Sequence, residues 1–159
     1  MDDSCQQVVL RNATENDVAF LCEVYASTRT EELALTGWDD LQKAKFCHMQ
    51  FTAQDAHYKT YYPSARYHVI ECDGEPVGRL YVDRWEREIR IMDIALLTGW
   101  RRRGIGSRLL EDLQAEGKAA GKALSIHVEK FNPALQWYER LGFKAVEDKN
   151  VYWLMRLEP

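Results

Sequence analysis

The distribution of apolar and polar residues follows two periods along this chain. Stretches that alternate every second residue predict strands, and stretches that repeat every three to four residues predict amphipathic helices. The alternating stretches lie at 8–12, 67–72, 76–83, 123–129, 143–146 and 151–157. Asp73-Gly74 separates the second of these from the third and predicts a hairpin with a primed-type turn.

Four stretches carry the helical period and begin near residues 14, 39, 105 and 133. They end near residues 29, 58, 117–121 and 142. One apolar face is expected on the first helix, from Val18, Leu21, Cys22 and Tyr25, and one on the third, from Ile105, Leu109, Leu110 and Leu113. The second stretch has a weak stripe and carries side chains typical of core or groove packing: Phe46, Met49, Phe51, His57 and Tyr58. Thr14-x-x-Asp17 predicts a capping box at the start of the first helix. Asn132 followed by Pro133 predicts the N-cap and first turn of the last helix. The segment 30–38 between the first two helices is polar and is broken by Gly37, so we expect no helix there.

The stretch 89–97 is apolar almost throughout and predicts a buried strand. Its apolar residues hold the odd phase at Ile89 and Ile91 and the even phase at Ile94 and Leu96. Such a slip of one residue is typical of a β-bulge. A central strand that is apolar on both faces explains the pattern equally well, because Met92, Ala95 and Leu97 are apolar too. Both interpretations stay open.

A connection rich in glycine and arginine joins this strand to the helix that begins near residue 105. It reads Leu97-Thr98-Gly99-Trp100-Arg101-Arg102-Arg103-Gly104-Ile105-Gly106-Ser107-Arg108. The first turn of a helix leaves backbone N–H groups without partners, and the helix dipole favours an anion there. Glycine lets a phosphate approach the backbone closely. The connection therefore predicts a phosphate site, with a solvated basic helix start as the alternative. Neither the P-loop pattern nor the dinucleotide glycine pattern is present in it.

The pattern Arg101-x-x-Gly104-x-Gly106 resembles the acyl-CoA pyrophosphate loop of the GNAT N-acetyltransferase superfamily. A second stretch, Asn132-Pro133-Ala134-Leu135-Gln136-Trp137-Tyr138-Glu139-Arg140-Leu141-Gly142-Phe143, resembles the last conserved block of that superfamily. The two blocks have the family's order and separation, and the resemblance covers about residue 67 to the C-terminus. The expected fold class is α/β (α+β), with a GNAT-like mixed, mostly antiparallel sheet, a splayed central parallel strand pair and the order βααβββαβαββ.

The resemblance also implies roles for individual residues. The backbone of Ile94, Ala95 and Leu96 would hold the pantetheine arm and the acetyl carbonyl of acetyl-CoA, and Asn132 would touch the same arm. The pyrophosphate would be wrapped by Arg101, Arg102, Arg103, Gly104, Ile105, Gly106 and Ser107. Tyr138 would be the general acid, with a tyrosine that merely packs on the sheet as the alternative.

The general base and the acceptor residues are argued from the residues of this chain. The glutamate that is usual on the bulged strand is replaced at about that position by Arg90. His127 stands five residues before Asn132, where some protein-acetylating members carry a glutamate, and its unperturbed pKa near ~6.5 would let it accept a proton. A satisfied polar histidine is the alternative. Glu31 and Glu32 are candidates to hold a cationic amine, or else form an exposed acidic loop.

Length, charge and cysteine usage narrow the remaining possibilities. A chain of 159 residues predicts one domain over 1–159, and its net charge of −4 argues against a nucleic-acid partner. The cysteines, Cys5, Cys22, Cys47 and Cys72, are widely spaced, which predicts reduced thiols and no metal site. The acidic start, Met1-Asp2-Asp3, and the lack of a run of ~18 apolar residues predict a cytoplasmic chain without signal peptide or membrane span.

These observations predict an acyltransferase that moves an acetyl group from acetyl-CoA directly to an amine of a small molecule or protein. Neither block contains a cysteine, so no covalent enzyme intermediate is expected. A non-catalytic acyl-CoA-binding sensor with the same loop is the first alternative, and a nucleotide-binding module is the second. The identity of the acceptor and the oligomeric state, including a homodimer, stay open.

Overall fold

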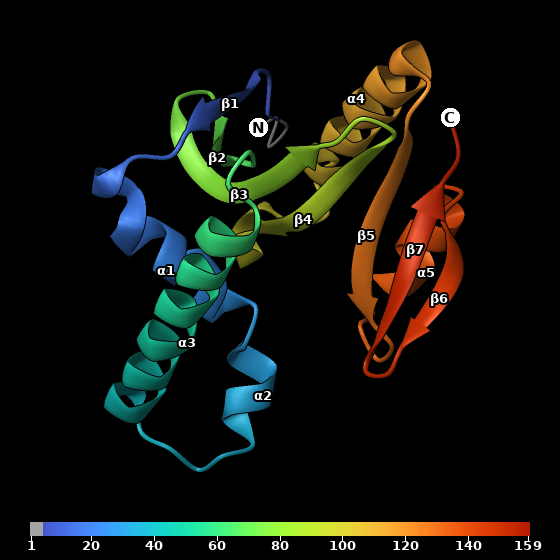
Figure 1. Cartoon of the computed structure of the whole chain (residues 1–159). Coiled ribbons are helices and arrows are strands. Elements are labelled where there is room, and N and C mark those ends of the chain that lie inside the picture. The colour runs from blue at the N-terminus through green and yellow to red at the C-terminus, as the bar shows by residue number, and fades with distance from the viewer. Residues whose placement is uncertain (1–4) are drawn as a thin grey trace. The chain divides into compact units, whose positions relative to one another are not determined.

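The computed structural model describes residues 5–159, so the acidic start Met1-Asp2-Asp3 lies outside the described residues. In the described part, seven strands form a sheet with the order β1-β2-β3-β4-β5-β7-β6 (Figure 1). The strands are β1 (Val8–Asn12), β2 (Arg66–Cys72), β3 (Glu75–Arg84), β4 (Glu88–Leu96), β5 (Ala123–Glu129), β6 (Lys144–Lys149) and β7 (Tyr152–Leu157). The helices are α1 (Val18–Ser27), α2 (Thr30–Ala34), α3 (Asp40–Tyr61), α4 (Ile105–Ala120) and α5 (Leu135–Arg140), with 3₁₀ turns η1 (Glu15–Asp17) and η2 (Thr98–Trp100).

This architecture confirms the predicted class, a mixed and mostly antiparallel sheet with one parallel pair, β4 and β5. The predicted order βααβββαβαββ is also observed, with the short helix α2 as an addition. The described residues cluster into two compact units, one of residues up to 81 together with 94–106, the other of 82–93 and 107–159. A single domain over the whole chain therefore stays a prediction.

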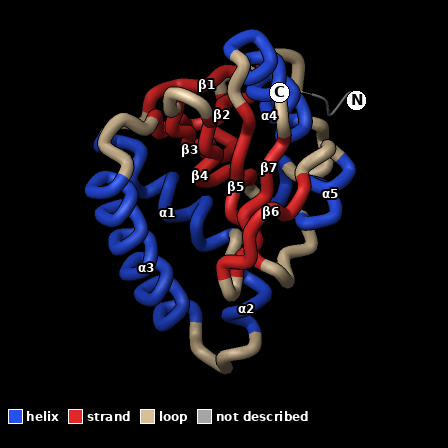
Figure 2. The backbone as a smooth tube through the Cα atoms, turned by 45° about the vertical axis from the view of Figure 1, so that its right-hand side comes forward, coloured by secondary structure: helices blue, strands red, loops and turns tan. Residues whose placement is uncertain are grey.

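The first unit has its core where three helices pack on β2. Figures 1 and 2 both show α1 and α3 lying side by side, and a loop at the bottom of each view joins α2 to the beginning of α3. The buried side chains of this core come from all four elements: Leu21, Tyr25, Leu33, Cys47, Phe51 and Val69. Leu33 explains why α2 forms within a polar segment, because its burial stabilises a short helix that the sequence pattern does not predict. Gly37, at φ 74°, then ends the segment as expected.

Capping boxes open two helical segments of the first unit, η1 and α3. Thr14 and Asp17 form the predicted box, but it opens the 3₁₀ turn η1, and α1 follows at Val18. The Arg11 guanidinium donates two hydrogen bonds of 2.9 Å to the Asp17 carboxylate, and these bonds lower the pKa of Asp17 to about 2. Val18, expected on the buried face of α1, is 46% exposed.

The second predicted helix differs from its predicted bounds mainly at its end. The Asp39 side chain caps α3, which begins one residue after the predicted start and runs to Tyr61 rather than residue 58.

Two cysteines predicted to be reduced form a disulfide. Cys5 and Cys72 are joined, whereas Cys22 and Cys47 are free thiols. Pairing of β1 with β2, in which Val8 faces Cys72, brings the start of the described chain beside the end of β2. Asp73 completes the junction by accepting hydrogen bonds from the backbone N–H groups of Gln6 and Gln7. The expectation of four reduced thiols is wrong because a strand pairing, not a sequence motif, unites this pair.

The second unit is built on β5. Glu88–Ile91 of β4 pairs in parallel with Ala123–Ile126, and β7 pairs antiparallel along the other edge of β5. Figure 2 shows β5, β7 and β6 as neighbouring strands. The predicted apolar face of the helix after the glycine connection is confirmed, because the four residues expected on it are at most 4% exposed: Ile105, Leu109, Leu110 and Leu113.

Two boundaries in the second unit differ from the predictions. The last helix, α5, begins at Leu135 rather than Pro133, because the Asn132 side chain caps a tight turn instead, accepting from the Ala134 N–H at 2.9 Å. Strand β6 runs to Lys149, so the turn into β7 is made by Asn150, at φ 72°, and Val151. Among the described residues, no helix combines the length and the apolar character needed to cross a membrane.

Candidate functional site

The end of β4 lies close against β3. A Cβ atom placed on Gly78 of β3 would lie 2.3 Å from the Ala95 carbonyl oxygen and 2.8 Å from a Leu96 methyl carbon. Only glycine therefore lets the two strands approach this closely. The Leu97 N–H also donates to the Val77 carbonyl at 2.9 Å. Residues 94–96, predicted to hold an acyl-CoA arm, thus belong to a strand end that packs closely on β3, and they are half-buried.

The phase slip in the sequence of β4 coincides with a change in burial. Ile89 and Ile91 are fully buried, and Arg90 between them is 8% exposed, so this part of the strand is covered on both faces. From Met92 to Leu96 every residue is half-buried. The part that is covered on both faces matches the central-strand interpretation, and the bulge stays a prediction.

The connection after β4 is a tight turn into α4. Arg102 has φ 61° and Gly104 has φ 82°, both in the left-handed region. No described heavy atom lies within 4 Å of a Cβ placed on Gly104, beyond its chain neighbours, so the backbone is open to an approaching group there. Gly106 and Ser107 stand in the first turn of α4, whose N–H groups have no intrahelical acceptor. A phosphate fits this chemistry.

The three successive arginines of the connection have different surroundings. Arg101 is directed to protein acceptors: its Nε donates to the Leu96 carbonyl at 2.9 Å, and its Nη2 donates to the Ser27 carbonyl at 3.3 Å. The Arg103 guanidinium stacks over the Trp100 ring at 4.8 Å. Arg102 is exposed. The sequence pattern did not distinguish these roles, because the acceptors of Arg101 are backbone groups, one of them 74 residues away.

In the second unit, Tyr138 of α5 is buried and 5% exposed. Its ring packs edge-on against Phe143 with centroids 5.8 Å apart. Burial, and secondarily the charge of Asp93, raises the pKa of Tyr138 above its ordinary value. The hydroxyl therefore holds its proton throughout the neutral range, as a proton donor must.

A polar network covers one face of β4, β5 and β7. Arg90 Nε donates to Ser125 Oγ at 2.7 Å, and its Nη2 lies 3.3 Å from the Glu88 carboxylate. Glu88 also accepts from Arg156 Nη1 at 3.2 Å. Sequence reasoning noted Arg90 only as a missing glutamate and overlooked this network. Polar residues alternating in phase at 88 and 90, and at 125 and 127, were the signal that could have revealed it.

His127 joins this network through its Nδ1 atom, which lies 3.4 Å from Arg90 Nη1. A guanidinium can only donate, so Nδ1 must accept, and the neutral ring carries its proton on Nε2. Burial, together with the positive charge of Arg90, lowers the pKa of His127. The ring is thus neutral at pH 7, as predicted, but its lone pair faces a cation. A general-base role would require this contact to break.

Residues 63–145, more than half of the chain, match the family model described as acetyltransferase (GNAT) domain. The chain belongs to the GNAT acetyltransferase family. An N-alpha-acetyltransferase of Sulfurisphaera tokodaii is 31% identical over 113 residues, which are 61% of this chain and 66% of that protein. An uncharacterized N-acetyltransferase of Bacillus subtilis, CgeE, is 32% identical over 71 residues, 44% of this chain and 27% of that protein. The chain thus spans less than two thirds of the length of these relatives.

A solved structure resembles the fold of this chain over nearly its whole length. The PaiA N-acetyltransferase of Thermoplasma acidophilum, solved in complex with coenzyme A, superposes with a TM-score of 0.73. The match covers 97% of this chain and 100% of that one at 14% identity, so it bears on the fold alone.

The predicted acceptor residues of this GNAT chain lie on α2. Glu32 is already paired, because its carboxylate accepts from Arg29 Nη1 at 3.0 Å. Arg29 also donates to the Tyr25 hydroxyl at 3.2 Å. Glu31 is exposed. The pairing cancels much of the negative charge that a cationic amine would meet at Glu32.

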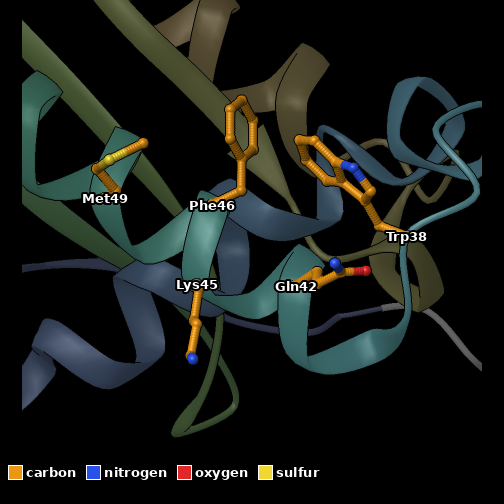
Figure 3. A pocket seen from close by; sticks show the side chains of 5 residues that line it. All are labelled: Trp38, Gln42, Lys45, Phe46 and Met49. Atoms are coloured by element: carbon orange, nitrogen blue, oxygen red, sulfur yellow. The ribbon is translucent and has the colours of Figure 1, made fainter.

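An open hollow of about 390 Å³ lies at the first half of α3 (Figure 3). Trp38 and Phe46 line it with rings 5.3 Å apart, and Met49 adds a thioether. Gln42 and Lys45 contribute the polar part of the lining. The sequence placed Phe46 and Met49 among side chains for core or groove packing, and the hollow accounts for both.

One group of side chains in the described part of the chain brings metal-ligating atoms together. The sulfur atoms of Cys5 and Cys72 and a carboxylate oxygen of Asp73 lie within 4.8 Å of one another. Both sulfurs are consumed by the disulfide, so this group offers a metal no thiolate.

Proposed function

We propose that this GNAT chain transfers an acetyl group from acetyl-CoA directly to an amine of a small molecule or protein. The observation that carries the proposal is the glycine-rich connection from β4 to α4, open at Gly104, in a chain whose family is GNAT. Coenzyme A bound to a GNAT protein of the same fold supports acetyl-CoA as the donor.

The pyrophosphate of acetyl-CoA would bind the backbone N–H groups from Arg102 to Ser107, with Arg102 adding charge. Ile94, Ala95 and Leu96 would present backbone groups to the pantetheine arm and the acetyl carbonyl. Asn132 keeps two amide N–H donors for the same arm, because its bond to Ala134 uses only its oxygen. Oriented backbone donors of this kind stabilise the oxyanion that forms in acyl transfer.

In the reaction, the amine nitrogen attacks the thioester carbonyl, the carbon–sulfur bond breaks, and the amine loses a proton. Tyr138 would give its proton to the departing thiolate. Its burial and raised pKa support this role, since a protonated phenol is available at any neutral pH.

His127 remains our candidate for taking the proton of the amine, through a water. Its neutral state supports the role, and its contact with Arg90 weighs against it. The alternative of a structural histidine gains from that contact. The contact between His127 and Arg90 also supports the alternative that the domain is a sensor, which binds acyl-CoA without catalysis.

The acceptor would lie along the first two helices and their link, 29–38, where Trp38 borders the hollow. Glu31 is the better placed of the two glutamates to meet a cationic amine, because Glu32 is paired. A cytoplasmic location and a homodimer stay predictions, and the Cys5–Cys72 disulfide weighs against a fully reducing compartment.

The test is a thiol-release assay with acetyl-CoA and a panel of amines, peptides and aminoglycosides. We expect free coenzyme A to appear with at least one acceptor class. Binding of coenzyme A without release by any acceptor would favour the sensor. Competition by dinucleotides at equal concentration would instead favour a nucleotide-binding module.

A further inference from the structure

Arg101 begins the glycine connection, yet its guanidinium joins two other parts of the first unit. Its Nε donates to the carbonyl of Leu96, the last residue of β4. Its Nη2 donates to the carbonyl of Ser27, the last residue of α1, and lies 3.5 Å from the Ser27 hydroxyl oxygen. One side chain therefore links the connection to a strand end and to a helix end.

Both acceptors suit a guanidinium. The last carbonyls of a helix have no intrahelical partner and carry the negative end of its dipole, so a cation there is stabilising. The planar fork of arginine presents several donors in fixed directions and can reach two separate carbonyls at once. A lysine ammonium retains the charge at this position but is a single point donor.

Ser27 leads directly into the segment proposed as the acceptor wall. Thr28 caps α1, Arg29 follows, and α2 begins at Thr30. Within this segment Arg29 binds both Tyr25 and Glu32. The contact with Arg101 is thus made at the point where α1 passes into that wall.

The connection itself is a backbone that a ligand would hold. Arg102 and Gly104 both have positive φ, and the first turn of α4 offers its N–H groups. A pyrophosphate bound to residues 102–107 would restrict the backbone on which Arg101 stands. The contact to Ser27 would then be populated more often.

We propose that Arg101 is a positioning residue that couples occupation of the glycine connection to ordering of the α1–α2 segment. The inference rests on the proposed function, since it takes acetyl-CoA as the ligand of the connection. Binding of acetyl-CoA then prepares the acceptor wall. By reciprocity, an acceptor bound to that wall tightens acetyl-CoA by the same factor.

Hydrogen exchange with coenzyme A as the probe tests the coupling without a known acceptor. In the parent protein, coenzyme A slows exchange at residues 102–110 and also at 24–36, the latter by about fivefold or more. Arg101→Lys still binds coenzyme A and still shows protection at 102–110, but loses the added protection at 24–36. Ser27→Ala retains the protection, because the carbonyl acceptor remains.

A purely structural Arg101 gives a different result. Arg101→Lys then speeds exchange at 24–36 in the free protein, while the change caused by coenzyme A stays at its parent value, and that outcome overturns the inference. Protection at 102–110 without any at 24–36 in the parent overturns it too, leaving the proposed function intact. No protection at 102–110 in the parent contradicts the proposed function itself, and the inference falls with it.

Discussion

Two polar regions occur along the chain, one before and one after the residue at which β4 changes from buried to half-buried. At Glu88 and Arg90, charged groups are bonded to one another and to Ser125 and Arg156. After Leu96, the connection presents an exposed Arg102 and an open backbone at Gly104. The two regions look alike in the sequence, because each contains arginine next to apolar residues. Polar groups that already have partners stabilise the fold, whereas donors with open space around them are available to a ligand.

The largest effect should follow from a bulky substitution in the glycine-rich connection after β4. Gly106→Glu adds bulk and negative charge where the pyrophosphate is proposed to bind. Losing two charge-assisted hydrogen bonds at about 1.5–3 kcal/mol each weakens coenzyme A binding by more than about a hundredfold. Calorimetric titration of the folded variant measures this. Gly99→Ala is the matched control, because a Cβ there meets nothing within 4 Å among the described atoms, and affinity should stay within about twofold.

The next largest effect should come from removing the proposed general acid, Tyr138. Tyr138→Phe keeps the ring against Phe143 but removes the proton donor, so kcat should fall about ten- to a thousandfold with little change in acetyl-CoA affinity. Because its pKa is raised, the parent should show no loss of rate from ionisation of this tyrosine up to pH ~10. Tyr152→Phe on β7 serves as the control. An undiminished kcat in Tyr138→Phe means that the thiolate leaves unaided or through water.

Substitutions at Glu88 and Arg90, where the polar groups already have partners, should change the stability of the fold rather than the binding of coenzyme A. Arg90→Met leaves the mostly buried Glu88 carboxylate with one cation fewer, which should lower the free energy of unfolding by about 2–4 kcal/mol. Coenzyme A affinity should hardly change. Arg84→Met removes an exposed pair with Glu116 and should cost less than about 1 kcal/mol. Denaturant titration measures the free energy of unfolding of both variants. Equal losses would contradict the claim that the network around Arg90 contributes more to stability than an exposed ion pair.

His127 should make the stability of the network around Arg90 depend on pH. A histidine whose folded pKa is lowered binds protons more readily when unfolded, so stability falls as pH drops from about 6.5 toward the folded value. His127→Gln should flatten that dependence. As a general base, His127 would also make the variant's kcat loss at pH 7 shrink as pH rises. A pH–rate profile that overlays the parent assigns His127 to the structure alone.

The smallest effect should come from the acidic pair on α2. Replacing both Glu31 and Glu32 by glutamine should raise KM for a cationic acceptor only about two- to fivefold, because Arg29 already neutralises Glu32. Steady-state kinetics with an acceptor found by thiol release measures this. An unchanged KM removes both glutamates from the acceptor site.

Much of the fold could be predicted because its signals are local. Alternation located six of the seven strands, and a continuous apolar run located β4. The capping box at Thr14 and Asp17 marked the turn that leads into α1, and the apolar stripe of α4 was correct. Glycines marked the connection after β4 for the same reason. A positive φ and a phosphate-accessible backbone both favour glycine, so glycines in the sequence indicate where this geometry occurs.

The parts that could not be predicted depend on residues far apart in the chain. The disulfide joins cysteines 67 residues apart, and only the pairing of β1 with β2 brings them together. The link from Arg101 to Ser27 ends on a backbone carbonyl, which leaves no trace in residue identity. Helix α2 forms because Leu33 reaches a core that belongs to other elements.

The measurement closest to the central claim follows backbone amide resonances during titration with coenzyme A and, separately, with pantetheine, which lacks the pyrophosphate. We predict that coenzyme A shifts the amides of residues 102–107 most and saturates, whereas pantetheine leaves them nearly unmoved. Saturable binding of coenzyme A that leaves Gly104 and Gly106 unchanged, or equal shifts with pantetheine, would contradict the assignment of this connection to the pyrophosphate.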